Sequence, residues 1–197
     1  LFSSPNSFFN SSIITKELAY SIISSSLEDA VRKRIDNTDR EIACLLSGGL
    51  DSSLITALVK KYHKGDLHTW SIGFKGSEDL KYAQLVADKI GTIHHSIEVE
   101  ESEFLNAIPE VIYNIESYDT TTVRASVGNW LICKHIKEKS NAKVIFNGDG
   151  ADEVMGGYMY FYMAPNALEF DKECVRLLKD ICYFDVLRSD RSISSHG

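Results

Sequence analysis

Short apolar runs alternate with amphipathic stretches along most of this chain. An apolar, partly β-branched run predicts a buried strand at 42–46, and three further strands are predicted at 67–74, 92–99 and 142–146. Between them, apolar residues recur at three- and four-residue steps, which is the spacing of a helix with one buried face. The predicted helices span 16–34, 54–62, 77–90, 102–115 and 123–139. Because Pro109 interrupts the fourth, we expect either two short helices or one kinked helix there.

The order of these elements predicts an α/β fold, an open parallel sheet with helices on both faces. Short connections and apolar strands favour parallel pairing through helical crossovers. In such a sheet the carboxyl ends of the strands meet at one edge, where ligands bind. That edge should carry residues 47–53, 72–73 and 147–152. Residues 1–15 show no periodicity and predict a linker or an N-terminal arm.

The first loop at this edge has a composition suited to phosphate. It reads Ser47-Gly48-Gly49-Leu50-Asp51-Ser52-Ser53 and joins a predicted strand to a predicted helix. Glycine lets a backbone approach a ligand closely, and the free N–H groups and dipole of a helix N-terminus favour an anion. Asp51 alone would repel that anion, which suggests a divalent cation between carboxylate and phosphate.

The second loop combines carboxylates and glycines in a way that hydrophobic folding does not explain. Residues 147–158 read Asn-Gly-Asp-Gly-Ala-Asp-Glu-Val-Met-Gly-Gly-Tyr. Beside a phosphate site, such carboxylates suit cation binding or the handling of a proton or an amine. For the aromatic residues Tyr158, Tyr160, Phe161 and Tyr162, we favour core or interface packing over a place in a pocket.

Composition and charge narrow the classes of function. The formal net charge of −7 over 197 residues argues against nucleic-acid binding through a basic surface. No apolar run approaches the roughly 18 residues of a transmembrane helix, so we expect no membrane association and a cytoplasmic protein. The four cysteines include no C-x-x-C pair and predict buried free thiols rather than disulfides or a zinc site.

Both loops resemble those of one enzyme family. The first resembles the S-G-G-x-D-S loop that binds pyrophosphate in the PP-loop ATP pyrophosphatases, whose fold is adenine nucleotide alpha-hydrolase-like. The second resembles the S-G-E-G-S-D-E loop of the synthetase domain of glutamine-dependent asparagine synthetases. Residues 160–166 resemble that family's Y-x-Y-F and K-A-P-N motifs, and further matches lie at 116–126 and 185–191.

This resemblance implies ATP-dependent synthesis of asparagine. The β-carboxylate of aspartate would be adenylated with release of pyrophosphate, and ammonia from glutamine would then displace AMP. ATP and Mg²⁺ would be required, and an N-terminal glutaminase domain outside this chain would supply the ammonia. Residues 16–197 would then be a synthetase domain truncated at its C-terminal end, and a homodimer is left open.

The resemblance also assigns roles to individual residues. Pyrophosphate would be held by Ser47, Gly48, Gly49, Asp51, Ser52 and Ser53. The nucleotide would be contacted by Leu46, Ile72, Asn147 and Gly148. The Mg²⁺ ligands would be Asp51 and Asp152. Aspartate would be recognised by Glu153, Asp185 and Arg188, and the catalytic set would comprise Asp149, Glu153 and Arg188.

Two residues depart from the family's second loop. Asp149 stands where the family has glutamate, and Asn147 stands where it has the first serine. We hypothesise that Asp149 is the catalytic carboxylate, although about 1 Å of lost reach can cost on the order of 10²-fold in rate. Two other functions stay open: a related PP-loop synthetase, such as a β-lactam-forming enzyme that needs no ammonia, and a non-catalytic ATP-binding module.

Overall fold

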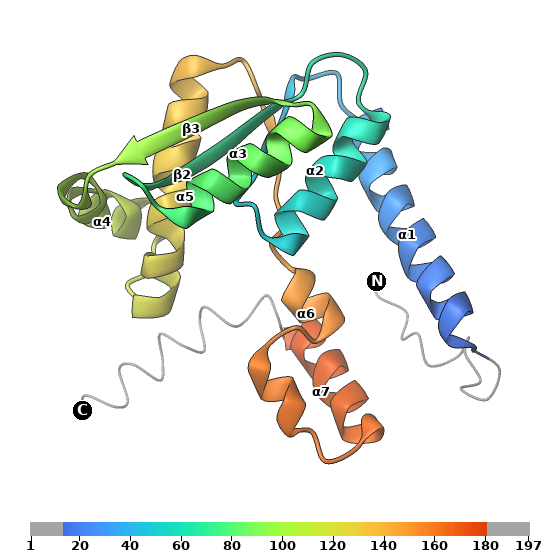
Figure 1. Cartoon of the computed structure of the whole chain (residues 1–197). Helices are drawn as coiled ribbons and strands as arrows, with labels where there is room; N and C mark the ends of the chain where they lie inside the picture. The colour runs from blue at the N-terminus through green and yellow to red at the C-terminus, as the bar shows by residue number, and fades with distance from the viewer. Residues whose placement is uncertain (1–13, 181–197) are drawn as a thin grey trace, which may run out of the picture.

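Four parallel strands form one sheet in the order β3-β2-β1-β4 (Figure 1). The computed structural model describes residues 14–180. The strands are β1 (Ile42–Leu45), β2 (His68–Phe74), β3 (Ile93–Val99) and β4 (Val144–Phe146). In β1, Cys44 is paired with Thr69 of β2 on one side and with Phe146 of β4 on the other. The first strand in sequence is therefore central, and the last is paired with it.

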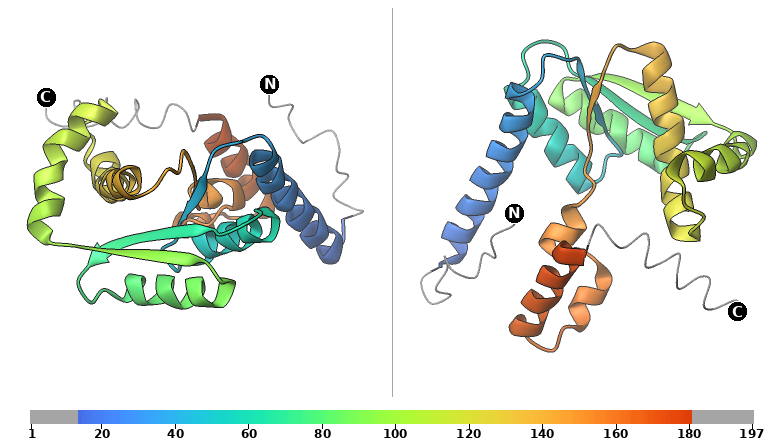
Figure 2. Two further views of the ribbon diagram at one scale, coloured as in Figure 1. Left: turned by 90° about the horizontal axis from the view of Figure 1, so that it is seen from above. Right: turned by 180° about the vertical axis from the view of Figure 1, so that it is seen from behind.

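Helices cover both faces of this sheet, which confirms the predicted α/β class. Figure 2 shows α2 and α3 on one face and α4 and α5 on the other, with α1 beside α2. The helical elements are α1 (Lys16–Asp36), α2 (Leu50–Tyr62), α3 (Glu78–Ile90), α4 (Glu101–Ile115), α5 (Thr120–Lys139), α6 (Ala151–Met155), the 3₁₀-helix η2 (Met159–Met163) and α7 (Ala167–Asp180).

Successive residues of β1 enter different layers of the core. Ala43 belongs to the apolar cluster that contains Trp70 of β2 and Ile132 of α5. Cys44 belongs to the cluster on the other face, which includes Val59 of α2. Because side chains alternate along a strand and both faces are covered, the strand is a continuous apolar run in the sequence.

The cysteines only partly follow the prediction of buried free thiols. Cys44, Cys133 and Cys174 are free, but Cys133 is exposed on α5 and Cys174 is only partly buried. Burial raises the pKa of the Cys44 thiol to about 12, so this cysteine stays protonated at neutral pH. Cys182 lies outside the described residues.

Helix α1 packs on the sheet through its C-terminal half. Val31 is buried in the core, whereas Leu18 and Ile23 are 45% and 44% exposed, so the expected buried face covers only part of the helix. Glu28 fixes this half to α2, since its carboxylate accepts hydrogen bonds from the Tyr62 hydroxyl at 2.6 Å and the Lys61 ammonium at 3.0 Å. These bonds lower the pKa of Glu28.

Helix α2 begins four residues earlier than the sequence pattern predicts. Gly49 is its N-cap, with φ −71° and ψ 167°, and the Ser53 N–H donates to the Gly49 carbonyl at 3.1 Å. Asp51 therefore lies in the first turn, where the helix dipole favours a negative charge. Serine and aspartate usually precede a helix, and Leu50 is 81% exposed, so hydrophobic periodicity did not mark this turn.

Helix α4 runs unbroken from Glu101 to Ile115 with Pro109 inside it, so of the two predicted arrangements the structure has one helix and not two short ones. The helix packs against α5, and Val111 and Ala107 are buried in the cluster that they share with Val127 of α5. Proline has no N–H to donate to the carbonyl of Leu105, and this packing offsets the free-energy cost of the missing hydrogen bond.

Pro109→Ala is expected to raise the melting temperature by about 4–8 °C. An interior proline destabilises a helix by about 3 kcal/mol. Proline also lowers the conformational entropy of the unfolded chain, which stabilises the folded protein by about 0.4–1 kcal/mol. The net gain of about 2 kcal/mol corresponds to that shift for a domain of roughly this size. Thermal unfolding measures it, with Asn106→Ala on the exposed side of the same helix as the control. An unchanged or lower melting temperature would show that the proline is tolerated without cost.

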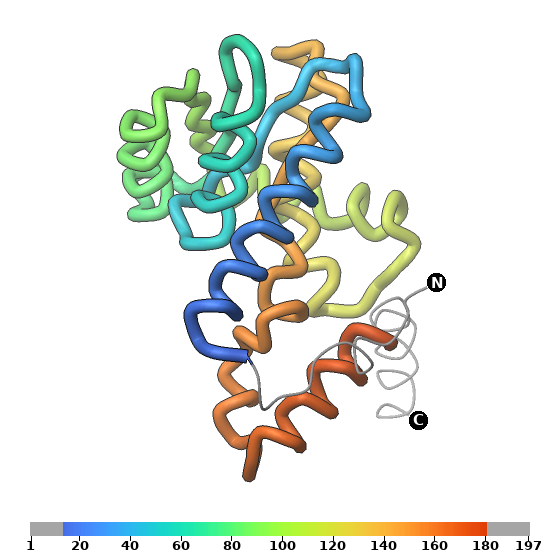
Figure 3. Tube along the Cα trace, turned by 90° about the vertical axis from the view of Figure 1, so that its right-hand side faces the viewer, coloured from blue at the N-terminus to red at the C-terminus, as the bar shows by residue number. Residues whose placement is uncertain are grey.

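The chain after β4 forms a separate helical unit at the carboxyl edge of the sheet, which the sequence analysis did not predict. Figure 1 shows α6, η2 and α7 together below the sheet, and Figure 3 shows α1 running beside the β4–α6 stretch. Phe161 is buried there against Phe170, with ring centroids 5.2 Å apart, which confirms the packing predicted for this residue. None of the described helices combines the length and apolar character needed to cross a bilayer.

Candidate active site

A cavity of about 430 Å³ joins the two predicted loops at the carboxyl edge of the sheet. From the first loop and the start of α2 come Ser47, Gly49, Asp51 and Ser52. From the second loop and α6 come Asn147, Gly148, Asp149, Gly150, Asp152 and Glu153. The remaining lining residues are Leu45, Asn129 and Tyr158. Strand pairing explains the juxtaposition, because β1 and β4 are neighbours and end side by side.

Hydroxyl groups brace the first loop from within. The Ser47 N–H donates to Ser52 Oγ at 3.2 Å, and the two serine hydroxyls lie 2.9 Å apart. The Ser52 hydroxyl also donates to the Gly49 carbonyl at 3.3 Å. These bonds hold the loop in a tight turn directly before α2, whose N-terminus faces the cavity with its dipole positive.

Gly48 lets this turn lie against α3. Its φ of +82° is in the left-handed region, and a Cβ at this position would come within 2.6 Å of Tyr82 Cβ and 2.7 Å of the Ala83 backbone nitrogen. Both the backbone conformation and the space exclude a side chain. Gly48, which was predicted to hold pyrophosphate, thus packs against α3 and does not line the cavity.

Gly148 lets the second loop touch the first. A Cβ on Gly148 would lie 2.8 Å from the Ser52 backbone nitrogen and 3.0 Å from Asp51 Cβ. The main chain of the second loop therefore packs directly on the first turn of α2, which fixes the two halves of the cavity relative to each other.

Three carboxylates of the second loop and α6 line the cavity, and each has a neighbour that restrains it. The Asn147 amide donates to Asp149 Oδ2 at 2.6 Å. The Tyr158 hydroxyl donates to Glu153 Oε1, and the Asp152 side chain lies against Gly157, where a Cβ would collide with it. The loop thus presents an array of acidic groups beside a helix N-terminus.

The residues predicted to bind magnesium suit that ion chemically. Asp51 and Asp152 both line the cavity, and Mg²⁺ prefers carboxylate and phosphate oxygens. Within residues 14–180 no group of three or more histidine, cysteine or acidic side chains could enclose a metal ion without other ligands. A magnesium ion at these two residues would therefore need phosphate or water oxygens to complete its coordination.

Several predicted site residues do not line this cavity. Leu46 is 1% exposed and belongs to the core beneath α3, and Ile72 is partly buried between two core clusters. The Ser53 hydroxyl is buried and, among the described residues, has no hydrogen-bond partner. Any contact of Leu46 with a nucleotide would have to involve its main chain. Asp185 and Arg188 lie outside the described residues, so their roles remain predictions.

Asn129 and Tyr158 line the cavity although neither was predicted to be a site residue. Tyr158 was expected to serve in packing, and its place beside Glu153 depends on the turn at Gly156, which has φ +65°. Asn129 reaches the cavity from α5, which covers the face above β1. The sequence carried no signal for it, because the 123–139 stretch is amphipathic and contains several other polar residues.

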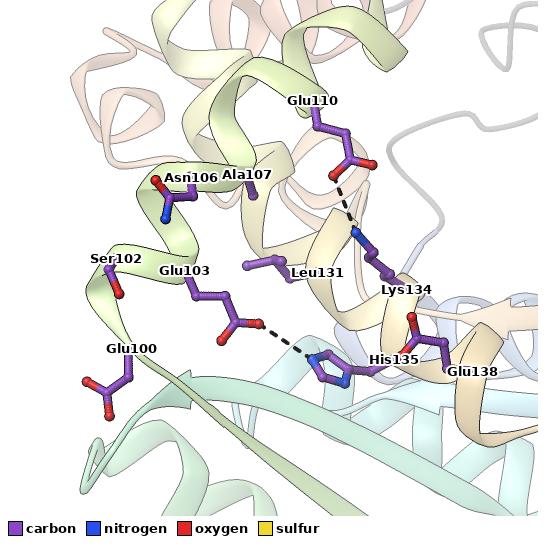
Figure 4. A pocket seen from close by; sticks show the side chains of 10 residues that line it. All are labelled: Glu100, Ser102, Glu103, Asn106, Ala107, Glu110, Leu131, Lys134, His135 and Glu138. Atoms are coloured by element: carbon purple, nitrogen blue, oxygen red, sulfur yellow. Dashed lines mark hydrogen bonds and ion pairs between the residues drawn. The ribbon is translucent and has the colours of Figure 1, made fainter.

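A different cavity, of about 580 Å³, lies between α4 and α5 (Figure 4). It shares no lining residue with the candidate site. Two side-chain pairs join the helices there: Glu110 with Lys134 at 3.4 Å, and Glu103 with His135 at 3.9 Å, the second being an ion pair only when the histidine is protonated. Exposed pairs of this kind contribute little free energy, and we assign this cavity no chemistry.

Comparison with known proteins identifies the same family that the two loops resemble. The family described as asparagine synthase matches residues 23–172. The glutamine-hydrolysing asparagine synthetase of Cricetulus griseus is 48% identical over 175 residues, which are 86% of this chain and 31% of that protein. The enzyme of Gallus gallus is 47% identical over the same shares. Among solved structures, the NH3-dependent NAD synthetase from Campylobacter jejuni has 18% identity and a TM-score of 0.49, covering 73% of this chain and 62% of that one.

Proposed function

This chain belongs to the asparagine synthase family, and from that membership we propose that it carries the ATP-dependent reactions of glutamine-hydrolysing asparagine synthesis. The observation that carries the proposal is the cavity in which a phosphate-type loop and an acidic loop meet. The chain spans 31% of the length of the relatives it matches, so the complete enzyme would include parts beyond this sequence.

In the first reaction, a β-carboxylate oxygen of aspartate would attack the α-phosphorus of ATP. The bond from that phosphorus to the oxygen bridging it to the β-phosphorus breaks, and pyrophosphate leaves. Ser47, Gly49 and Ser52 line the cavity, which supports a role for them in binding the leaving group, where backbone amides and the helix dipole would stabilise developing negative charge. Asp51 and Asp152 would hold Mg²⁺, whose chemistry here is to neutralise negative charge on the phosphates.

In the second reaction, the nitrogen of ammonia would attack the acyl carbon of β-aspartyl-AMP. The carbon–oxygen bond to AMP breaks, asparagine forms, and one proton must leave the nitrogen. Asp149 faces the same cavity as the phosphate loop, and a carboxylate there can accept this proton. Glu153 lines the cavity and accepts a hydrogen bond from Tyr158, which supports the proposal that it binds the α-ammonium group of aspartate.

We infer the remaining parts of the enzyme from the same relatives, which are described as glutamine-hydrolysing. A glutaminase domain outside this sequence would release the ammonia. Arg188 and Asp185 would complete the aspartate site, with the Arg188 guanidinium binding a carboxylate bidentately.

Asp149→Asn in the full-length enzyme tests the proposal most directly. The amide keeps the shape of the carboxylate but cannot take a proton, so we expect asparagine formation to fall by about 10²–10⁴-fold. ATP binding, measured by calorimetry, should stay within a factor of about two because the phosphate loop is unchanged. Unaltered pyrophosphate release and asparagine yield would exclude Asp149 as the base.

The wild-type enzyme separates this function from the two alternatives. Pyrophosphate release is followed with and without aspartate and with and without ammonia. Release that needs aspartate and yields asparagine only with ammonia supports the proposal. Adenylation followed by ring closure without ammonia would indicate a β-lactam-forming relative, and ATP binding with no release would indicate a non-catalytic module.

A further inference from the structure

We infer that Asn147 is a positioning residue for Asp149, and that these two departures from the family's loop form one functional pair. This inference rests on the proposed function, because it concerns how the carboxylate assigned to the ammonia step is held. Asn147 was predicted only as a nucleotide contact. The structure instead gives its side chain a partner inside the loop, with the amide nitrogen 2.6 Å from Asp149 Oδ2.

The backbone on the two sides of this bond is held very differently. Asn147 directly follows Phe146, which is buried and paired with Cys44 in the sheet. Gly148 is packed against the first turn of α2. Asn147 is therefore anchored by regular structure on one side and by a close contact on the other.

Asp149, in contrast, lies between two glycines. Gly148 precedes it, and Gly150, with φ +91°, follows it as the N-cap of α6. Its side chain is exposed in the cavity. The side chain is exposed and no neighbour packs against Gly150, so packing alone does not orient this carboxylate.

The Asn147 amide provides the missing restraint. Among residues 14–180 it is the one hydrogen-bond donor to the Asp149 carboxylate. It occupies a single carboxylate oxygen, so the other remains able to accept a proton. A bond to a charged acceptor is among the stronger hydrogen bonds, which suits it to fixing an exposed side chain.

Matching lengths explain why the two departures occur together. Asparagine is longer than serine and reaches across Gly148, while aspartate is shorter than glutamate. The longer donor thus meets the shorter acceptor two residues away. In the S-G-E-G arrangement the lengths are exchanged, so we expect the two changes to compensate each other.

Four variants of the full-length enzyme test this pairing: Asn147→Ala, Asn147→Ser, Asp149→Glu and the double variant Asn147→Ser/Asp149→Glu. We expect Asn147→Ala to lower kcat for asparagine formation by about 10–100-fold, as misplacement of a catalytic group does. The KM for ATP should change less than about twofold, because a positioning role leaves the uniform binding of ATP unchanged. A rise in KM for ATP with kcat unchanged would instead show a nucleotide contact and overturn the inference.

The double variant provides the second readout. Asn147→Ser and Asp149→Glu should each lower kcat by about tenfold or more, while the two together should restore it to within about threefold of wild type, since residues in contact are not additive. If the loss of kcat in the double variant equals the product of the two single losses, the pairing is wrong. Asn114→Ala is the matched control, because it removes another exposed asparagine amide, which donates to the Glu110 carbonyl at 2.8 Å far from the site.

Failure of the proposed function is recognised separately. If the wild-type enzyme releases no pyrophosphate with aspartate, that function is wrong, and crystal structures of wild type and Asn147→Ala decide the pairing without any activity. A carboxylate of Asp149 that moves or becomes disordered in Asn147→Ala supports the inference. A carboxylate that keeps its place in both structures overturns it.

Discussion

Gly48→Ala is expected to lower the melting temperature by about 10 °C and to abolish ATP-dependent pyrophosphate release. A left-handed conformation costs a non-glycine residue about 1–2 kcal/mol. The new methyl group would also collide with the backbone of α3 at Tyr82 and Ala83, and such overpacking typically costs about 1–3 kcal/mol. Together these terms lower the free energy of unfolding by about 2–5 kcal/mol, which corresponds to the shift given for a domain of this size.

Gly91→Ala separates the two causes. Gly91 has φ +77°, close to that of Gly48, but an added Cβ would meet nothing within 4 Å. Thermal unfolding of this variant therefore reports backbone strain and the loss of the α3 cap, and its activity should remain close to wild type. Equal losses of stability in Gly48→Ala and Gly91→Ala would show that contact with α3 is unimportant.

Asp51→Asn is expected to reduce pyrophosphate release by about 10²–10³-fold while leaving the fold intact. Removing one group that stabilises developing charge in a transition state typically has an effect of about this size. The structural cost is small, because a carboxylate in the first turn of a helix contributes about 0.3–1 kcal/mol through the dipole. Steady-state pyrophosphate assays at several magnesium concentrations measure the effect, and the required magnesium concentration should rise.

Asp36→Asn supplies the control for Asp51→Asn. Asp36 is the last residue of α1, is exposed, and lies outside the cavity. The same neutralisation there should change pyrophosphate release by less than about twofold, since distant surface charges are screened by salt. Asp51→Asn with release within threefold of wild type would remove Asp51 from the phosphate site.

The sheet could be predicted because its strands have a simple pattern. The run at 42–46 is apolar throughout, as buried parallel strands are, and Gly91 ends α3 as a left-handed cap. The start of α2 could not be predicted this way, because its first turn consists of an exposed leucine and polar residues. The continuity of α4 through Pro109 depends on packing with α5, which periodicity does not contain.

In the candidate site, too, some features could be predicted from the sequence and others depend on packing. Topology brought the two loops to one edge, and the cavity joins them. The topology did not reveal that Ile72 lies in the core or that Asn129 reaches the cavity. Both depend on how α5 packs on the sheet. The hydrogen bond between Asn147 and Asp149 also depends on backbone geometry that only the folded loop provides.

The pairing of β1 with β4 makes the cavity depend on a contact between distant parts of the chain. Asp51 and Gly148 touch although nearly one hundred positions separate them, so the loop between them must close before the contact forms. β4 has three residues and lies at the edge of the described sheet. Short edge strands open at lower free energy than central ones, so the cavity should dissolve by local opening before the rest of the domain unfolds.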